Sequence, residues 1–185
     1  MGTTANYGLR YPDATDAPEV WVDMEELADD VDAALATVGE KPILRLVQQT
    51  GQALADGAVV ALQFGTGATE IDSHGFHSET VNNTRATPTV PGWYRVTASV
   101  GLPGAVYSRY SIQIHKNGTA VSPYSRVGGN STAQGVGTQT SLLVQMNGST
   151  DYVEAYAAQS STASRNTATG VPFQSVLEVE WVRSL

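Results

Sequence analysis

Short apolar stretches separated by turn residues fill the sequence from residue 43 to its end, and they limit the folds open to this chain. In several of them apolar and polar residues alternate, and clusters of Gly, Asn, Pro, Ser and Thr lie between them. The stretches are 43–49, 58–64, 69–75, 92–102, 109–118, 140–148, 151–159 and 175–182. Alternation with a period of two is typical of a strand with one buried face, and regular spacing of short strands favours a sandwich or barrel. The sequence therefore predicts an all-β domain.

Three of these stretches indicate which side chains point into the core. The residues expected to face inward are Tyr94, Val96, Ala98, Val100, Ile112, Ile114, Leu177, Val179 and Trp181. Glu178 and Glu180 alternate with the last group and are expected on a solvated face, because successive side chains of a strand point to opposite sides. The Asn117-Gly118 pair is a strong signal for a hairpin turn.

Composition and charge exclude several classes of protein. With no cysteine, the 185-residue chain has no disulfide scaffold, thiolate zinc site or thiol nucleophile. A net charge of −8 leaves no basic stripe, so we expect no nucleic-acid partner. The first 20 residues lack the features of a signal peptide, and no run of about 18 apolar residues exists, so we expect synthesis in a cytoplasm and no membrane insertion.

Residues 24–38, MEELADDVDAALATV, form the one helical pattern in the sequence. The apolar positions recur at intervals of three and four, as in the seam of a coiled coil: Met24, Leu27, Val31, Ala34 and Val38. Asp23 is a suitable N-cap and Gly39 a suitable stop. Because an isolated helix of this length is marginal in water, the stripe needs a partner. The chain's own β domain and other copies of the chain both remain open from this region alone.

Residues 1–22 have no helical or alternating period and are expected to be extended. The large apolar side chains of this segment are Tyr7, Leu9, Tyr11 and Trp21. They suit either docking to another protein or packing on the chain's own domain. The expected organisation is therefore an attachment segment over 1–22, a short coiled-coil helix over 23–39 and a β head over 40–185.

No pattern in the sequence predicts catalysis. It contains no nucleophile elbow, HExxH motif or P-loop, so we expect no catalytic residue, no cofactor and no enzyme activity. Asp72 and His74 would share a face of a strand, and His77 lies close by, which makes a weak divalent-metal site conceivable. Without a second cluster of ligands, we predict no metal.

Two polar segments, 122–140 and 159–172, are predicted to be loops at an end of the sandwich. Their candidate ligand-facing residues are Tyr124, Arg126, Asn130, Arg165 and Asn166. Hydrogen-bonding groups on exposed loops suit a sugar or a cell-wall polymer. The alternative is that both segments are flexible polar connections without a ligand.

The order of several motifs resembles the C1q/TNF family. The matching segments are TPTVPGWYRVTASV (87–100), YSIQIHKNGT (110–119), SLLVQMNGSTDYVEAYAAQSS (141–161) and FQSVLEVEWV (173–182). The resemblance covers about residues 43–185 and implies a jelly-roll sandwich that assembles as a homotrimer about a threefold axis. That family often has a trimeric stalk before the head, and residues 24–38 would be this stalk.

The segment YGLRYPDATDAPEVWVDMEELADDVDAAL (7–35) resembles the opening of tail or fibre proteins of actinobacteriophages. Together the two resemblances imply a structural protein of a phage virion, a homotrimeric tail or head fibre or minor tail protein. Its N-terminal segment would attach to other phage structural proteins, and its head would face a host surface glycan or protein. The alternative is a trimeric module outside any virion that binds a carbohydrate or a protein.

Overall fold

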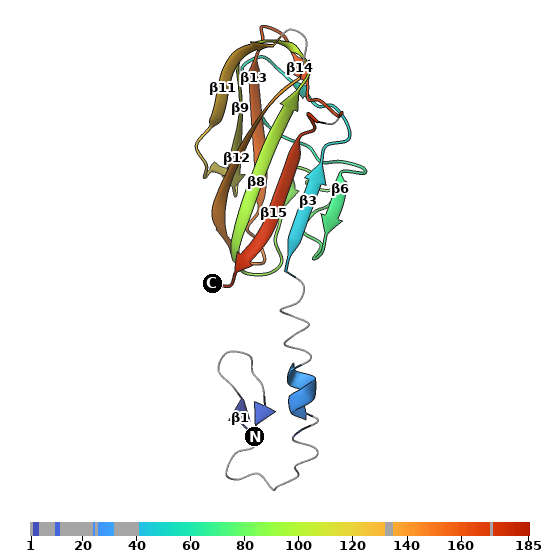
Figure 1. The fold of residues 1–185 in the computed structure, drawn as a ribbon, viewed down its shortest axis with the longest axis vertical. Coiled ribbons are helices and arrows are strands. Elements are labelled where there is room, and N and C mark those ends of the chain that lie inside the picture. The colour runs from blue at the N-terminus through green and yellow to red at the C-terminus, as the bar shows by residue number, and fades with distance from the viewer. Residues whose placement is uncertain are drawn as a thin grey trace. The chain divides into compact units, whose positions relative to one another are not determined.

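The structure is a computed structural model that describes residues 2–3, 10–11, 24, 26–31, 41–131, 135–170 and 172–185. The chain divides into two compact units, Met1–Lys41 and Pro42–Leu185. Figure 1 shows both units. Each unit is described by itself below.

The described residues of the first unit form one small sheet and one helical segment. Strand β1 (Gly2–Thr3) pairs antiparallel with β2 (Arg10–Tyr11), and Met24 and residues 26–31 are helical. Met24, Leu27 and Val31 are 61%, 42% and 37% exposed, so this part of the predicted apolar stripe is open to solvent in the single chain. The other predicted residues of this unit, Tyr7, Leu9, Trp21, Ala34 and Val38, lie outside the described residues, and only the backbone of Tyr11 is described.

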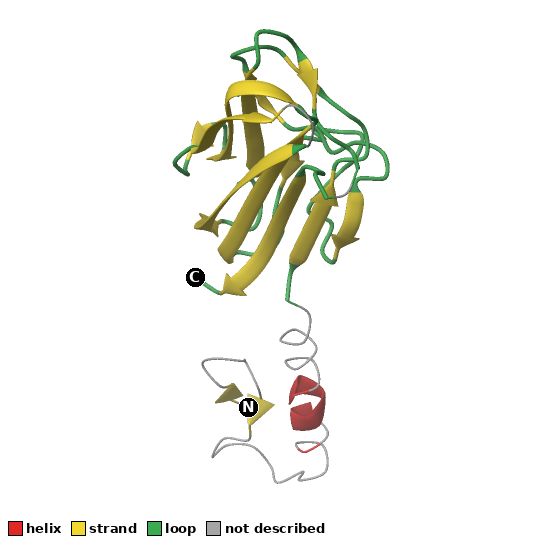
Figure 2. Ribbon diagram, turned by 45° about the horizontal axis from the view of Figure 1, so that its top comes forward, coloured by secondary structure: helices red, strands yellow, loops and turns green. Residues whose placement is uncertain are grey.

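The second unit is built from two antiparallel sheets that face each other, as Figure 2 shows. The five-stranded sheet has the order β12 (Val136–Met146), β8 (Gly92–Leu102), β15 (Val176–Arg183), β3 (Ile43–Val47) and β6 (Thr69–Asp72). The six-stranded sheet has the order β10 (Thr119–Ala120), β9 (Ala105–Lys116), β13 (Val153–Ser160) and β5 (Val59–Ala61), with β11 (Ser125–Ser131) on β9 and β7 (Arg85–Ala86) on β13. A separate pair joins β14 (Arg165–Asn166) to β4 (Ala53–Leu54).

The core lies between the two sheets and contains the side chains that the alternation predicted to face inward. Tyr94, Val96 and Ala98 of β8 are fully buried. Ile112 and Ile114 of β9 are fully buried too, so the inward assignments for these two strands are confirmed. The buried hydroxyl of Tyr94 donates a hydrogen bond to the Val90 carbonyl over 2.7 Å, and burial raises the pKa of this phenol to about 12.

Each of the eight stretches predicted as strands contains a strand, and the all-β prediction is confirmed. The Asn117-Gly118 turn is confirmed as well, with both residues at positive φ (51° and 77°) between β9 and β10. The prediction of a loop over 122–140 is wrong, because β11 and the first part of β12 lie there. The sequence of β11, SRVGGNS, has the composition of a turn, and the strand forms because its backbone pairs with β9.

Candidate assembly surface

One row of outward-facing side chains crosses the five-stranded sheet. The strand register places Leu143 of β12 beside Arg95 of β8, Arg95 beside Glu180 of β15, and Glu180 beside Ile43 of β3. The next row places Thr97 beside Glu178 and Glu178 beside Arg45. We call this side of the sheet the outward face. It carries exposed apolar residues and charges of both signs.

Arg45 on the outward face is ion-paired with two carboxylates. The Arg45 Nε donates to Glu70 Oε2 over 2.7 Å, and its Nη1 donates to Glu178 Oε1. The hydrogen bond that Arg45 donates to Glu70 and the charge of Glu178 raise the pKa of the Arg45 guanidinium, against the opposing effect of partial burial. Arg95 lies directly opposite Glu180, an arrangement that favours attraction across the strands. A second protein that covers Arg45 therefore buries its charge together with those of its two carboxylate partners and not as an isolated charge, which is the costly case.

An apolar patch lies at the end of the outward face nearest the C-terminus. Trp93, Leu143, Val182 and Arg183 line a hollow of about 300 Å³. Leu143 is 52% exposed in the single chain, and Val182 is exposed as well. Apolar side chains gathered beside a polar surround are typical of a protein contact surface. We call these four residues the apolar patch.

The apolar patch was not predicted from the sequence, although the sequence contains a signal for the patch. Tyr94 is predicted to face the core, so the alternation puts its neighbour Trp93 on the outward face. A tryptophan on the otherwise polar side of a strand is the signal. The contribution of Leu143 does not show in the sequence in the same way, because only the register of β12 on β8 brings it opposite Arg95, two positions from the residue opposite Trp93.

The other end of the outward face is covered by a segment that we call the strap, residues 168–170 and 172–175. The Ala168 N–H donates to the Gly101 carbonyl over 2.9 Å, and the Gly101 N–H donates to Ser175 Oγ over 3.2 Å. The Phe173 backbone lies directly on Gly101, where a side chain would overlap it. Glycine at this position of β8 therefore allows the strap to pass before it enters β15.

The net charge of the protein is concentrated in the first unit. Ten of the eighteen acidic residues and two of the ten basic residues precede Pro42, which leaves eight of each sign in the second unit. The β unit has no net charge at neutral pH, so copies of it can approach one another without overall repulsion.

The five residues predicted to face a ligand lie in strands or next to one. Arg126 and Asn130 belong to β11, and Arg165 and Asn166 belong to β14. Tyr124 directly precedes β11 and is exposed, with the Arg126 guanidinium 5.7 Å from the centre of its ring. The Asn130 side chain lies outside the described part. A ligand role for these five residues remains a prediction.

Asp72, His74 and His77 do not form the metal site that the sequence made conceivable. The side chains of Asp72 and His77 form hydrogen bonds to the backbone instead. The Asp72 carboxylate accepts backbone N–H bonds from Phe76 over 2.8 Å and from His77 over 3.0 Å. The ring nitrogens of His77 each lie 2.8 Å from a carbonyl oxygen, one of Phe64 and one of Arg85. Within the described ranges, no three His, Cys, Asp or Glu side chains gather as metal ligands.

The same contacts predict that His77 stabilises the fold. His77→Ala removes the partner of two backbone carbonyls, and we expect the free energy of unfolding to fall by about 2 kcal/mol. Urea unfolding followed by circular dichroism measures this change. His74→Ala is the control, because that ring bonds only to the neighbouring Ser73 hydroxyl, and its effect should stay below about 1 kcal/mol. Equal losses for the two variants would contradict the assignment.

The arrangement of the two sheets matches that of solved tumour necrosis factor (TNF)-family structures. Murine APRIL, solved at pH 8.0, superposes with a TM-score of 0.57 at 10% identity, covering 76% of this chain and 99% of that one. Eiger TNF from S. frugiperda superposes with a TM-score of 0.52 at 7% identity, covering 78% and 94%. The β unit is a TNF-like jelly roll. At such low identity the likeness concerns the fold alone.

The jelly-roll prediction is thereby confirmed. No protein-family model matches the sequence, and a search of curated proteins finds no match. In the part of the chain that the structure describes, no helix is long and apolar enough to serve as a membrane span.

Proposed function

We propose that this chain is a structural protein without catalytic activity that works as a homotrimer inside a bacteriophage virion. In this proposal the TNF-like jelly roll is the head, residues 24–38 form a short trimeric coil, and residues 1–22 attach the assembly to other phage structural proteins. The protein is made in the host cytoplasm and is built into a tail or head fibre, or acts as a minor tail protein.

The observation that carries the assembly part is the apolar patch on an outward face where Arg45 is already ion-paired with two carboxylates. Burial of Trp93 and Leu143 against another copy removes apolar surface from water, at about 25 cal/mol for each Å². Burial of Arg45 with Glu178 leaves neither of these two charges alone, and Arg95 and Glu180 lie opposite each other on neighbouring strands. The neutral β unit adds no net repulsion between heads. Three copies, rather than another number, is what the C1q/TNF resemblance implies.

The helix supports the same assembly from the other unit. Met24, Leu27 and Val31 recur at coiled-coil spacing and are all exposed in the single chain. Ala34 and Val38 continue the pattern in the sequence. Two heptads are too few for a stable isolated coil, so the coil depends on the head to bring the three helices together.

The virion part of the proposal rests on the sequence of residues 7–35 and its resemblance to phage tail and fibre proteins. Tyr7, Leu9, Tyr11 and Trp21 are the residues proposed to contact other phage proteins. The second candidate is a trimeric module outside any virion that binds a carbohydrate or protein. Exposed Tyr124 beside Arg126 favours it, since aromatic and guanidinium groups are common in binding surfaces.

Deletion of residues 1–22 tests the proposal and separates the two candidates. For a virion protein, we expect the shortened chain to keep a mass of three chains by light scattering and to be missing from purified particles. For a free module, the deletion should leave ligand binding unchanged. A wild-type mass of one chain in dilute solution contradicts the homotrimer in both. Release of reducing ends from host wall polymer would contradict the absence of catalysis.

A further inference from the structure

A polar groove lies between two loops of the jelly roll, away from the outward face. Its walls are formed by residues 75–87, which connect β6 to β8, and by residues 149–152, which precede β13. The groove has a volume of about 430 Å³ and is lined by Gly75, Phe76, His77, Ser78, Val81, Asn82, Arg85, Thr87, Ser149, Thr150 and Tyr152. Its lining includes the guanidinium of Arg85, the aromatic rings of Phe76 and Tyr152, and several hydroxyl groups.

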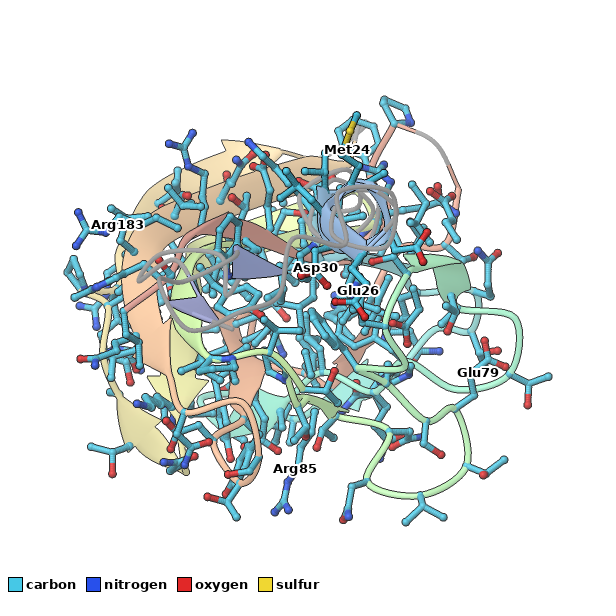
Figure 3. All side chains as sticks on the ribbon, turned by 90° about the horizontal axis from the view of Figure 1, so that it is seen from below. Met24, Glu26, Asp30, Glu79, Arg85 and Arg183 are labelled. Carbon is cyan, nitrogen blue, oxygen red and sulfur yellow. The ribbon has the colours of Figure 1, made fainter. Side chains whose placement is uncertain are left out.

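Arg85 is held in one orientation on the floor of this groove. Its guanidinium lies 4.0 Å from the centre of the Tyr152 ring, and its Nε lies 3.4 Å from Glu154 Oε1. The Glu154 side chain is 7% exposed and also accepts a hydrogen bond from the Thr84 hydroxyl over 2.6 Å. Figure 3 shows the Arg85 side chain at the edge of the sandwich. The ring and the carboxylate together fix the plane of the guanidinium.

The fixed orientation leaves the outer edge of the guanidinium available. The Arg85 side chain is 38% exposed, and among the contacts of the described residues its Nη atoms have no hydrogen-bond partner. A planar guanidinium with two free amino groups matches the two oxygens of a carboxylate or phosphate. Because Arg85 is already ordered, a ligand does not lose affinity to the cost of ordering it.

The two walls of the groove are pre-formed as well. In the first wall, His77 bonds to the carbonyls of Phe64 and Arg85, and Asp72 closes the turn before it. In the second wall, Asn147 Oδ1 accepts the backbone N–H groups of Ser149, Thr150 and Asp151. Sites for small ligands are usually formed before the ligand arrives, and these walls meet that condition.

Asp151 anchors the second wall to the adjacent hairpin. Partial burial tends to raise the pKa of its carboxyl. The Asn117 amide, the Lys116 ammonium and the Asn147 N–H bond to the carboxylate and outweigh that effect, so the pKa lies below its usual range. The Lys116 Nζ lies 2.9 Å from Asp151 Oδ2. The negative charge of Asp151 is thereby neutralised and does not oppose an anion in the groove.

We propose that this groove binds an acidic saccharide, with Arg85 holding its carboxylate or phosphate and the Ser and Thr hydroxyls meeting its hydroxyl groups. The inference concerns the head alone and does not depend on the virion role or the trimer. It places the ligand in a different part of the head from the residues that the sequence indicated, which lie in β11 and β14.

Ligand-observed NMR with the full-length protein tests the proposal. The probes are glucuronic acid, glucose 6-phosphate, glucose and inorganic phosphate. We expect both acidic sugars to bind more tightly than glucose. The two acidic sugars distinguish a carboxylate source from a phosphate source. Inorganic phosphate binding as tightly as glucose 6-phosphate would overturn the saccharide part.

Arg85→Gln should weaken the binding of the acidic sugars by about tenfold or more, because it removes the charge-assisted hydrogen bonds. Arg109→Gln is the control. Arg109 is an exposed arginine of β9 that does not line the groove, and the change should leave affinity unaltered. If Arg109→Gln weakens binding as much as Arg85→Gln does, or if Arg85→Gln has no effect, the groove is the wrong site.

Arg85→Gln also removes the partner of the buried Glu154 and can affect folding, so a second pair of variants avoids Arg85. Val81 lines the groove and is 65% exposed. Val81→Glu should weaken the binding of the acidic sugars, because it places a negative charge at the rim. Val81→Lys should strengthen their binding by about threefold at low salt, because it places a positive charge there. Light scattering of the same samples reports the trimer separately. Equal affinities for the two Val81 variants would overturn the proposal.

Discussion

Gly101→Ala is expected to lower the free energy of unfolding by about 3 kcal/mol, a large effect for a single added methyl group. The new Cβ atom would overlap the carbonyl group of Phe173 and would lie 3.1 Å from its Cα. These are backbone atoms, which cannot rotate away as the end of a side chain can. The strap must move, and the bonds from Ala168 to Gly101 and from Gly101 to Ser175 then break.

The displacement reaches the centre of the five-stranded sheet, because the strap runs directly into β15. Ser175 also accepts a hydrogen bond at its carbonyl from the Gln48 N–H over 2.9 Å, which ties the strap to the end of β3. We therefore expect the melting temperature to fall by about 10 °C, as measured by calorimetry.

Gly170→Ala is the matched control for this prediction. Gly170 belongs to the same strap, but a Cβ atom there would meet nothing within 4 Å. Its replacement should leave stability unchanged or raise it by about 0.5 kcal/mol, through the lower entropy of the unfolded chain. If Gly101→Ala were as stable as Gly170→Ala, the strap would not be held against β8 in the way described.

The sequence predicts the parts of this fold in which side chains decide the structure. Strand β8 could be predicted because Tyr94, Val96 and Ala98 alternate with outward residues, and β15 because Leu177 and Val179 do the same. Strand β11 could not, since its residues favour turns and its pairing with β9 comes from backbone hydrogen bonds. The composition of such a segment does not distinguish a loop from a strand.

The sites depend on contacts between distant residues, and for that reason the sequence predicts them less well. Arg85 and Tyr152 come together only because β7 pairs with the start of β13. The cluster of Asp72, His74 and His77 shows the converse. Those residues are close in sequence and include the residue types of a metal site, but Asp72 and His77 bond to the backbone and shape a loop.

Leu143→Asp is expected to abolish association of the heads, the largest effect predicted for assembly. Leu143 lies in the apolar patch. Burying a charged carboxylate in place of its apolar side chain would cost about 3 kcal/mol or more at each contact between copies, even beside Arg95 and Arg183, because the lost hydration of the ions outweighs their attraction. The proposed coil adds to the association of the heads, so the change is best made in a chain that also carries Leu27→Asp and Val31→Asp, where only the contact between heads is left to measure. By light scattering, we expect the coil variant to remain a trimer and the triple variant to have the mass of one chain.

Val106→Asp in the same coil variant is the control for the position of the contact. Val106 of β9 is 51% exposed, close to the 52% of Leu143, but it belongs to the six-stranded sheet. If the copies meet through the outward face, this variant should remain a trimer. If Val106→Asp separates the chains and Leu143→Asp does not, the copies meet through the six-stranded sheet. A single-chain mass for both would show that an added charge disrupts association wherever it is placed, and the contact could then not be assigned to the apolar patch.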